Sequence, residues 1–228
     1  MKLYVVATPI GNLNDISFRA IETLKNVDCI LCEDTRQTKK LLDHYQIEKP
    51  LVSYHHHSKI KKNNYILGLL KQGKNLAMVS DAGTPGLSDP GNKLIRLILD
   101  DLGEASIVPI PGSSAITAIL SVAGWSTDRF VFWGFLPAKK GRTIFFKGIK
   151  QSEYPIVFFE SPYRILKTLK QIDDFLNPLT CQVVAGRELT KMFETIYRGD
   201  LKQVISKIET ETARGEYVVV LFFKKSKN

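Results

Sequence analysis

The sequence is poor in cysteine and contains no long apolar run. It has three cysteines among 228 residues, and no stretch reaches the roughly 18 consecutive apolar residues that are read as a transmembrane helix. The amino-terminal apolar run stops at Thr8-Pro9, too early for the apolar region of a signal peptide. We therefore predict a cytoplasmic protein with no membrane partner, whose residues 3–7 form a buried strand.

Cys29 and Cys32 have the spacing of a redox or zinc pair. A structural zinc site takes four ligands, and the sequence offers no second pair because Cys181 stands apart. The pair lies in an apolar stretch typical of a buried strand, where residues three apart point to opposite faces. We predict inert core thiols in a reducing compartment, and no metal site.

The sequence also lacks two common nucleotide-binding fingerprints. No Gly-Lys-Ser/Thr triplet marks a Walker loop, and no Gly-x-Gly-x-x-Gly segment follows the first predicted strand. Three glycine- or proline-rich loops are present instead, at residues 7–12, 81–91 and 110–115, each directly after a predicted strand. Loops of this kind converge at the carboxyl ends of parallel strands, where ligands bind. One such loop could be an ordinary turn, but three predict a site for a small nucleotide-like cofactor.

The chain carries an excess of positive charge. Its formal net charge is +9, with basic residues gathered at 59–74, 139–150, 164–170 and 224–227. This balance predicts a polyanionic partner such as RNA, although a solvated lysine-rich surface is the alternative. The three histidines at 55–57 predict RNA contact or a surface loop, because neighbouring side chains on a strand point to opposite faces and do not converge on a metal.

The order of the predicted elements indicates two α/β domains. Strands first alternate with helices, which implies parallel pairing with helices on both faces of the sheet. After about Pro111 the pattern changes to four strands rich in aromatic and β-branched residues, with a helix at 164–175 and a basic, glycine-containing loop at 136–150. We therefore expect an N-terminal domain over 1–111 with a parallel sheet and a mixed α/β domain over 112–228.

Several segments resemble the tetrapyrrole methylase superfamily, and together they cover nearly the whole chain. The most specific are Asp81-Ala82-Gly83-Thr84-Pro85 and Glu160-Ser161-Pro162-Tyr163-Arg164, and the others are Val5–Leu13, Cys32–Arg36, Pro109–Ala115, Phe132–Pro137 and Gly186–Lys191. The resemblance implies two α/β domains of tetrapyrrole methylase type, with S-adenosyl-L-methionine in the cleft between them. It also implies a homodimer.

The resemblance is closest to a branch of the superfamily that modifies ribosomal RNA. It implies 2′-O-methylation of the ribose of a cytidine in the decoding centre of 16S ribosomal RNA in the small ribosomal subunit. Many members carry a further C-terminal helical segment, whereas this sequence ends soon after residue 223, so RNA contact would rest on the basic patches. The alternatives are a methylase of small tetrapyrroles, which the net charge disfavours, and a non-catalytic RNA-binding protein of the same fold.

The resemblance also implies a set of cofactor-binding residues. They are Pro9, Asp81, Ala82, Gly83, Thr84, Pro85, Ser88, Ser113, Ser114, Ala115 and Gly186. Asp81 suits the amino or ribose groups of the cofactor, and the serines suit its carboxylate. Asp81 could equally shape a turn, because aspartate often hydrogen-bonds to the backbone of its own loop.

Methyl transfer to a ribose oxygen depends mainly on positioning, and a base helps to remove the hydroxyl proton. The candidate bases and orienting groups are Glu33, Asp34, Glu160, Glu188 and Lys191. An acid in the segment at 33–34 could instead cap the following helix.

Contacts to RNA are expected from arginines and from the basic loop at 136–150. A guanidinium binds two phosphate oxygens at once, although each arginine could instead pair with a nearby acid. The candidates are Arg36, Lys139, Lys140, Arg142, Arg164 and Arg187. Phe132, Trp133 and Phe135 could stack on a base, but aromatic residues on a strand more often belong to the core.

Overall fold

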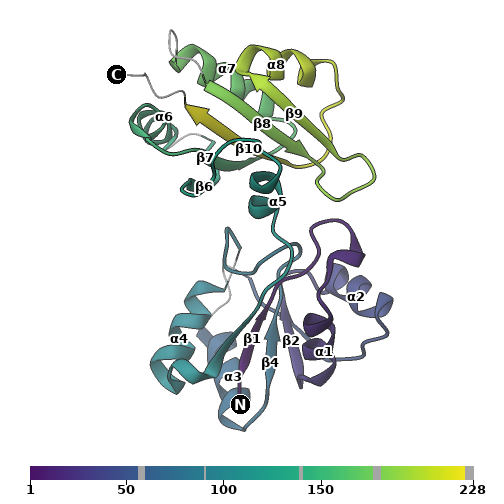
Figure 1. Ribbon diagram of the computed structural model, residues 1–228. Helices are drawn as coiled ribbons and strands as arrows, with labels where there is room; N and C mark the ends of the chain where they lie inside the picture. Colours follow the sequence, from purple (N-terminus) through teal and green to yellow (C-terminus); the bar gives the residue numbers. More distant parts are fainter. Residues whose placement is uncertain (56–59, 90, 139–140, 177–180, 224–228) are drawn as a thin grey trace. The chain divides into compact units, whose positions relative to one another are not determined.

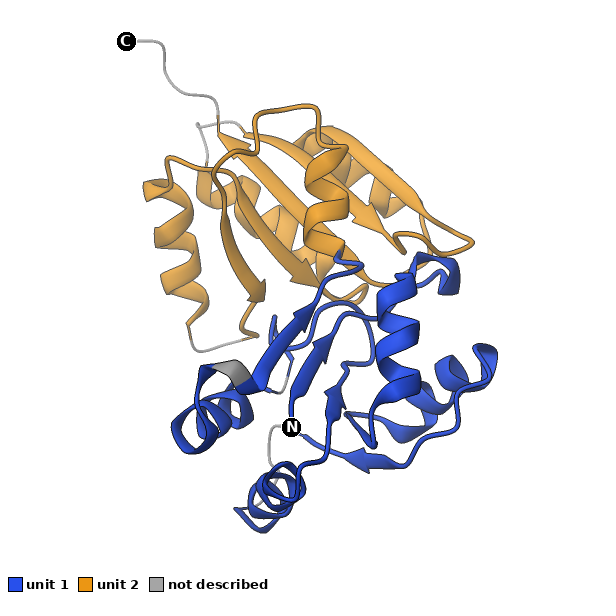
Figure 2. Cartoon of the chain, turned by 60° about the horizontal axis from the view of Figure 1, so that its bottom comes forward, with its two compact units in different colours: residues 1–114 blue, residues 115–228 orange. Residues whose placement is uncertain are grey.

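The computed structural model describes residues 1–55, 60–89, 91–138, 141–176 and 181–223. The chain divides into two compact units, residues 1–114 and 115–228 (Figure 2). This division lies three residues beyond the boundary expected at 111, since the loop after the last strand of unit 1 runs to Ser114. Each unit has its own five-stranded sheet.

Unit 1 is built on a parallel sheet with the strand order β3-β2-β4-β1-β5 (Figure 1). Its strands are β1 (Leu3–Val6), β2 (Cys29–Cys32), β3 (Leu51–Ser53), β4 (Leu76–Met78) and β5 (Ile107–Ile110). Every neighbouring pair is parallel, which confirms the predicted pairing. The carboxyl ends of all five strands therefore lie at one edge of the sheet.

Helices cover both faces of this sheet. The helices are α1 (Phe18–Asn26), α2 (Thr35–His44), α3 (Ile60–Lys71) and α4 (Asn92–Leu102), with short 3-10 helices at Leu13–Asp15 and Glu104–Ser106. Apolar residues of α1 and α2 share one core with the sheet, and those of α3 and α4 share the other. Ser17 caps α1 by accepting the Ala20 N–H at 3.1 Å.

The two cysteines of β2 lie in different cores. Cys29 packs on the side of α3 and α4, and Cys32 packs on the side of α1 and α2. Both thiols are free, and burial raises the pKa of each. The prediction of inert core cysteines is confirmed.

Unit 2 contains a mixed sheet with the order β6-β7-β10-β8-β9. Its strands are β6 (Val131–Phe135), β7 (Ile156–Glu160), β8 (Cys181–Arg187), β9 (Thr195–Asp200) and β10 (Tyr217–Phe223). β6 and β7 are parallel, whereas the other pairs are antiparallel. β9 was not predicted, because this edge strand is polar and only Tyr197 on it is fully buried.

The helices of unit 2 are α5 (Ala115–Ser121), α6 (Arg142–Gln151), α7 (Ile165–Leu176) and α8 (Leu201–Glu209). Residues of α6, α7 and α8 form one core with the sheet, while α5 contacts β8 and β10. The expected exposed loop at 136–150 is wrong from residue 142 onward. Phe145 and Ile149, one helical turn apart, are buried in the core and hold this segment as a helix. In the described part of the chain no helix has the length and apolarity to cross a membrane.

Candidate functional site

Two of the loops expected at the site are joined at the carboxyl edge of the unit 1 sheet. Thr8, just after β1, donates its N–H to the Gly83 carbonyl at 2.9 Å, and Gly83 donates its N–H back at 3.0 Å. The Thr8 hydroxyl also donates to the Ser80 carbonyl at 3.2 Å. The loops after β1 and β4 are therefore tied together by their backbones.

The loop after β5 joins the same cluster. The Thr84 hydroxyl donates to the Ser113 carbonyl at 3.4 Å, and the Ser113 hydroxyl donates to the Asp15 carbonyl at 3.0 Å. Gly83 has a φ of +79°, and a Cβ there would lie 3.3 Å from Cγ2 of Ile10. The backbone conformation therefore favours glycine, and a Cβ here would also require Ile10 to shift slightly.

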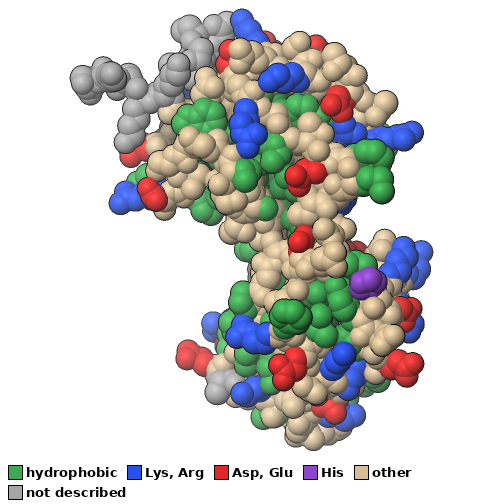
Figure 3. Space-filling model, turned by 45° about the vertical axis from the view of Figure 1, so that its right-hand side comes forward, with side chains coloured by type: hydrophobic (Ala, Val, Ile, Leu, Met, Phe, Trp, Pro, Cys, Tyr) green, Lys and Arg blue, Asp and Glu red, His purple; other side chains and the backbone are tan. Residues whose placement is uncertain are grey.

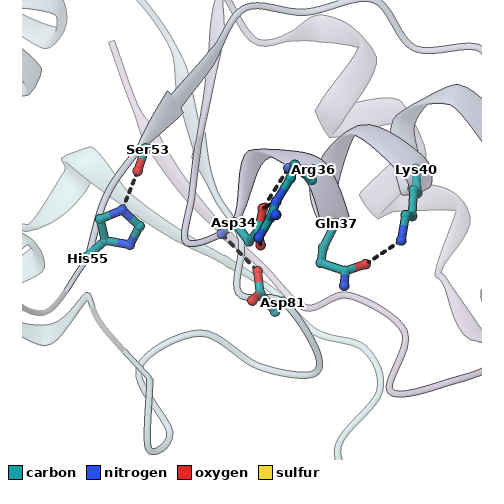
Figure 4. A network of polar contacts seen from close by, with 7 residues as sticks. All are labelled: Asp34, Arg36, Gln37, Lys40, Ser53, His55 and Asp81. Atoms are coloured by element: carbon teal, nitrogen blue, oxygen red, sulfur yellow. Dashed lines mark hydrogen bonds and ion pairs between the residues drawn. The ribbon is translucent and has the colours of Figure 1, made fainter.

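Asp81 connects this edge to the end of β2 (Figure 4). Its Oδ1 accepts the N–H of Asp34 at 3.0 Å, although 47 residues separate the two. Asp34 in turn accepts the N–H of Arg36 at 2.8 Å and caps α2. The alternative that an acid at this place caps the helix therefore holds for Asp34.

Asp34 and Arg36 also form a two-point ion pair. Asp34 Oδ1 accepts from Arg36 Nε at 3.1 Å, and Oδ2 accepts from Nη2 at 2.7 Å. The hydrogen bonds from the Arg36 side chain and backbone lower the pKa of Asp34 from 3.8 to about 2. Asp34 is therefore ionised at neutral pH and accepts a proton weakly, while the Arg36 side chain stays 86% exposed.

Glu33 differs from its neighbour in its surroundings. It is half-buried at the end of β2, and its side chain makes no hydrogen bond or ion pair with any residue that the structure describes. Neither oxygen of its carboxylate accepts a hydrogen bond from the described residues.

Glu160, at the end of β7 in unit 2, lies in a closed polar network. It is only 1% exposed, and it accepts from the Ser161 N–H at 2.8 Å and from the Thr168 hydroxyl at 2.8 Å. Arg164 Nη2 lies 2.6 Å from the same carboxylate. These contacts occupy both carboxylate oxygens and stabilise the turn from β7 into α7.

Arg142 and Arg164 extend this network to the segment after β6. Arg142 donates to the Thr168 hydroxyl at 2.8 Å and to the Pro137 carbonyl at 3.2 Å, and Arg164 donates to the Leu136 carbonyl at 3.1 Å. Burial lowers the pKa of Arg142. Both arginines, expected to contact RNA, thus engage groups of their own unit.

A second network lies beyond the end of β8. Glu188 Oε1 accepts from Lys191 Nζ at 2.9 Å and from the Glu216 N–H at 3.0 Å, and Lys191 also reaches Glu216 Oε2 at 3.1 Å. Desolvation alone would lower the pKa of Lys191, but its contacts with the two glutamates raise it overall. Lys191 is therefore protonated at neutral pH. Arg187 is buried and paired with Glu211.

The close packing around Gly186 leaves no room for a side chain, which local sequence patterns do not reveal. A Cβ at this position in β8 would lie 2.8 Å from Leu189 Cδ2 and 2.9 Å from Ile119 Cδ1. The missing side chain makes room for α5, which begins at Ala115. A side chain here would require Leu189 and Ile119 to shift.

The remaining candidates differ in exposure. Pro9, Gly83 and Pro85 are buried, whereas Asp81, Ala82 and Ser88 are exposed and Thr84, Ser113, Ser114 and Ala115 are half-buried. Lys139, Lys140, His56 and His57 lie outside the described residues. No group of three or more potential metal ligands occurs among the residues that the structure describes.

The three aromatic residues of β6 lie on opposite faces of the unit 2 sheet. Trp133 packs edge-on against Phe145 of the core, with ring centroids 5.3 Å apart. Phe132 and Phe135 instead contact Phe159, with centroids 5.1 and 5.2 Å away. The core interpretation therefore holds for Trp133, while Phe135 remains 58% exposed.

Residues 2–205 match the family model of tetrapyrrole (corrin/porphyrin) methylases. The chain is 46% identical to ribosomal RNA small subunit methyltransferase I of Synechocystis sp., over 96% of this chain and 78% of the relative. It is 45% identical to the protein of that name from Thermotoga maritima, over 98% of this chain and 99% of the relative, and 44% identical to that from Bacillus subtilis, over 96% and 74%.

Solved structures show the same fold at low sequence identity. A diphthine synthase has a TM-score of 0.73 at 16% identity and covers 97% of this chain and 90% of its own. A cobalt precorrin-4 methyltransferase of cobalamin biosynthesis has a TM-score of 0.71 at 16% identity, with coverage of 97% and 94%. The fold class predicted from the sequence is confirmed. The chain belongs to the tetrapyrrole methylase family, within the group of ribosomal RNA small subunit methyltransferase I proteins.

Proposed function

We propose that this protein transfers a methyl group from S-adenosylmethionine to the ribose 2′-hydroxyl of a cytidine in the decoding centre of 16S ribosomal RNA. The observation that carries the proposal is its 44–46% identity, over 96–98% of the chain, to proteins named ribosomal RNA small subunit methyltransferase I. The net charge of +9 supports a polyanionic substrate. A homodimer in the cytoplasm, acting on the small ribosomal subunit, is part of the same proposal.

The cofactor residues in this proposal are those expected from the sequence. S-adenosylmethionine supplies an electrophilic methyl group when it is bound. The chemistry of the edge fits such a ligand, since Asp81 offers an exposed carboxylate beside the backbone-linked loops. The proposed ligands are Pro9, Asp81, Ala82, Gly83, Thr84, Pro85, Ser88, Ser113, Ser114, Ala115 and Gly186.

Glu33 is the proposed base among the candidate catalytic residues. A base needs an available lone pair and access to the proton that it takes. Glu33 has no partner among the described residues, whereas Asp34 is held ionised by Arg36 and Glu160 is enclosed. Glu188 and Lys191 are paired with each other, which suits an orienting role. We propose Arg36, the exposed member of the arginine set, as an RNA contact.

Ribosomal RNA from a strain that lacks the gene tests the proposal. Mass spectrometry of nuclease fragments should show the loss of one ribose methyl group on a cytidine of 16S RNA, and the wild-type gene should restore it. Small subunits from that strain, treated with the purified chain and 13C-methyl-labelled S-adenosylmethionine, should gain the label on the same ribose. Methylation that persists in the deletion strain would refute the proposal, and label on a base would reject the 2′-O assignment.

A further inference from the structure

Charge alone does not locate an RNA-binding surface on this protein. Lysine and arginine side chains are scattered over both units on the face drawn in Figure 3, with acidic side chains among them. Several of the cations are also committed to ion pairs within the chain, such as Lys39 with Asp43 and Lys71 with Asp101. An RNA-binding surface is therefore expected where cations without ion-pair partners line a groove.

Unit 1 has such a hollow between β3 and the first turns of α3. It is an open groove of about 650 Å³. Its lining combines apolar, hydroxyl, imidazole, aromatic and cationic side chains: Leu51, Val52, Ser53, His55, Lys61, Lys62 and Tyr65. We call it the β3–α3 groove. None of these residues belongs to the candidate catalytic or cofactor set.

The two lysines of the groove are unpaired. Neither Lys61 nor Lys62 forms an ion pair or a hydrogen bond with any other residue in the described ranges. The first turn of α3 contains no acidic residue to balance them. Cations in a first turn are disfavoured by the helix dipole, so their presence does not serve the stability of this helix.

Tyr65 completes a surface suited to single-stranded RNA. It follows Lys61 by four residues, so the two side chains lie on the same face of α3, and it is 52% exposed. A cationic groove that follows the backbone, with an aromatic ring on which a base stacks, is the usual design of such sites. Ser53 and His55, which share a hydrogen bond of 2.6 Å, add polar groups at the other wall.

The position of the groove relates it to the proposed base. β3 is the edge strand of the sheet and pairs with β2. The Tyr54 N–H donates to the Cys32 carbonyl at 2.8 Å, so the end of the groove runs beside the end of β2, which leads directly into Glu33. Figure 4 shows Ser53 and His55 in the same close view as Asp34 and Asp81.

We infer that the β3–α3 groove binds the single-stranded RNA that flanks the target nucleotide, with Lys61 and Lys62 on phosphates and Tyr65 stacked on a base. This inference rests on the proposed function for the identity of the RNA. It adds a substrate-binding surface outside the cofactor loops and the candidate catalytic residues.

Binding of the full-length protein to a fluorescent single-stranded RNA with the decoding-centre sequence tests the inference. The variant Lys61→Gln/Lys62→Gln should weaken binding about tenfold or more and reduce the slope of log K against log[salt] by about 1.4, since each phosphate contact of a single strand contributes about 0.7. Tyr65→Leu should weaken binding about tenfold without changing the slope.

Lys25→Gln/Lys74→Gln is the matched control. It removes the same charge from exposed positions that precede β2 and β4, at the opposite edge of the sheet. Thermal melting and calorimetry with S-adenosylmethionine check that all variants fold and keep the cofactor site. Equal weakening by the control pair, or unchanged binding by the groove variants, would overturn the inference.

The outcomes also separate this inference from the proposed function. If the wild type methylates the ribose and the groove variants do so with unchanged KM for RNA, only the groove assignment fails. If the wild type binds the RNA through the groove but does not methylate it, the proposed function fails and the groove assignment stands. If the wild type does not bind the RNA, the groove assignment fails, and methylation of small subunits decides the proposed function separately.

Discussion

Adjacent carboxylates after β2 differ sharply in their surroundings. Asp34 accepts hydrogen bonds from Arg36, which bring its pKa to about 2, whereas Glu33 has no partner among the described residues. Because folding lowers the pKa of Asp34, its stabilising contribution is present above pH 3.8 and is lost as the pH falls toward 2. At neutral pH Asp34 thus orders the end of β2, and Glu33 is the proposed base.

The residue-scale prediction concerns Glu33. Glu33→Gln removes a base but keeps the size of the side chain, so kcat should fall by about 10²- to 10⁴-fold while the Kd for S-adenosylmethionine changes little. Single-turnover methylation assays and calorimetry measure the two quantities. Glu22→Gln, at an exposed position on α1, serves as the control and should leave both unchanged. A fully active Glu33→Gln enzyme would remove Glu33 from the mechanism.

At the scale of elements, Glu160 links β7 to α7. Its buried carboxylate accepts from Ser161, Thr168 and Arg164, and Thr168 in turn accepts from Arg142 at the start of α6. A buried carboxylate is tolerated only with such complete pairing. The Glu-Ser-Pro-Tyr-Arg segment contains a candidate catalytic residue and a candidate RNA contact. Its observed contacts stabilise the connection between β7 and α7.

The hydrogen-bond network of Glu160 leads to a prediction about stability. Glu160→Ala leaves Thr168 and Arg164 without their acceptor, and it should lower the free energy of unfolding by about 3 kcal/mol. Glu160→Gln should cost less, because its amide oxygen still accepts from Thr168. Urea unfolding of the full chain measures both. Glu153→Ala, at an exposed position, should change stability by no more than about 0.5 kcal/mol, and an equal effect of the two alanine variants would contradict the account.

Elements also mark where sequence patterns succeed and fail. The alternation of strands and helices predicted the parallel sheet of unit 1, because each of its strands is an apolar run bounded by turn residues. It missed α6, where basic residues and Gly141 suggested a loop although Phe145 and Ile149 lie one turn apart and are buried. It also missed the polar edge strand β9. It gave no helix at α8 (Leu201–Glu209) either, although Leu201, Val204, Ile205 and Ile208 have helical spacing and are buried.

For the whole molecule, the net charge of +9 predicts a salt dependence that differs between the two substrates. Binding of RNA releases counterions, so KM for small subunits should rise roughly tenfold or more over a few-fold increase in KCl. The affinity for S-adenosylmethionine should change far less, since a small zwitterionic ligand releases few ions. Steady-state kinetics and calorimetry in the same salt series compare them. A KM for small subunits that is independent of salt would argue against an electrostatic RNA surface.

Local patterns of apolar residues, glycine and proline were enough to predict the two-unit α/β organisation, the buried unreactive thiols and the three loops at strand ends. Motifs spread along the chain indicated the family. Which polar side chains remain available became visible only in the folded protein. Asp81 accepts a hydrogen bond from the backbone of Asp34, 47 residues away in the sequence. Glu160 is buried among its partners, whereas Glu33 has no partner among the described residues. Partners of a side chain are set by the long-range packing of loops and helices, which local patterns do not encode.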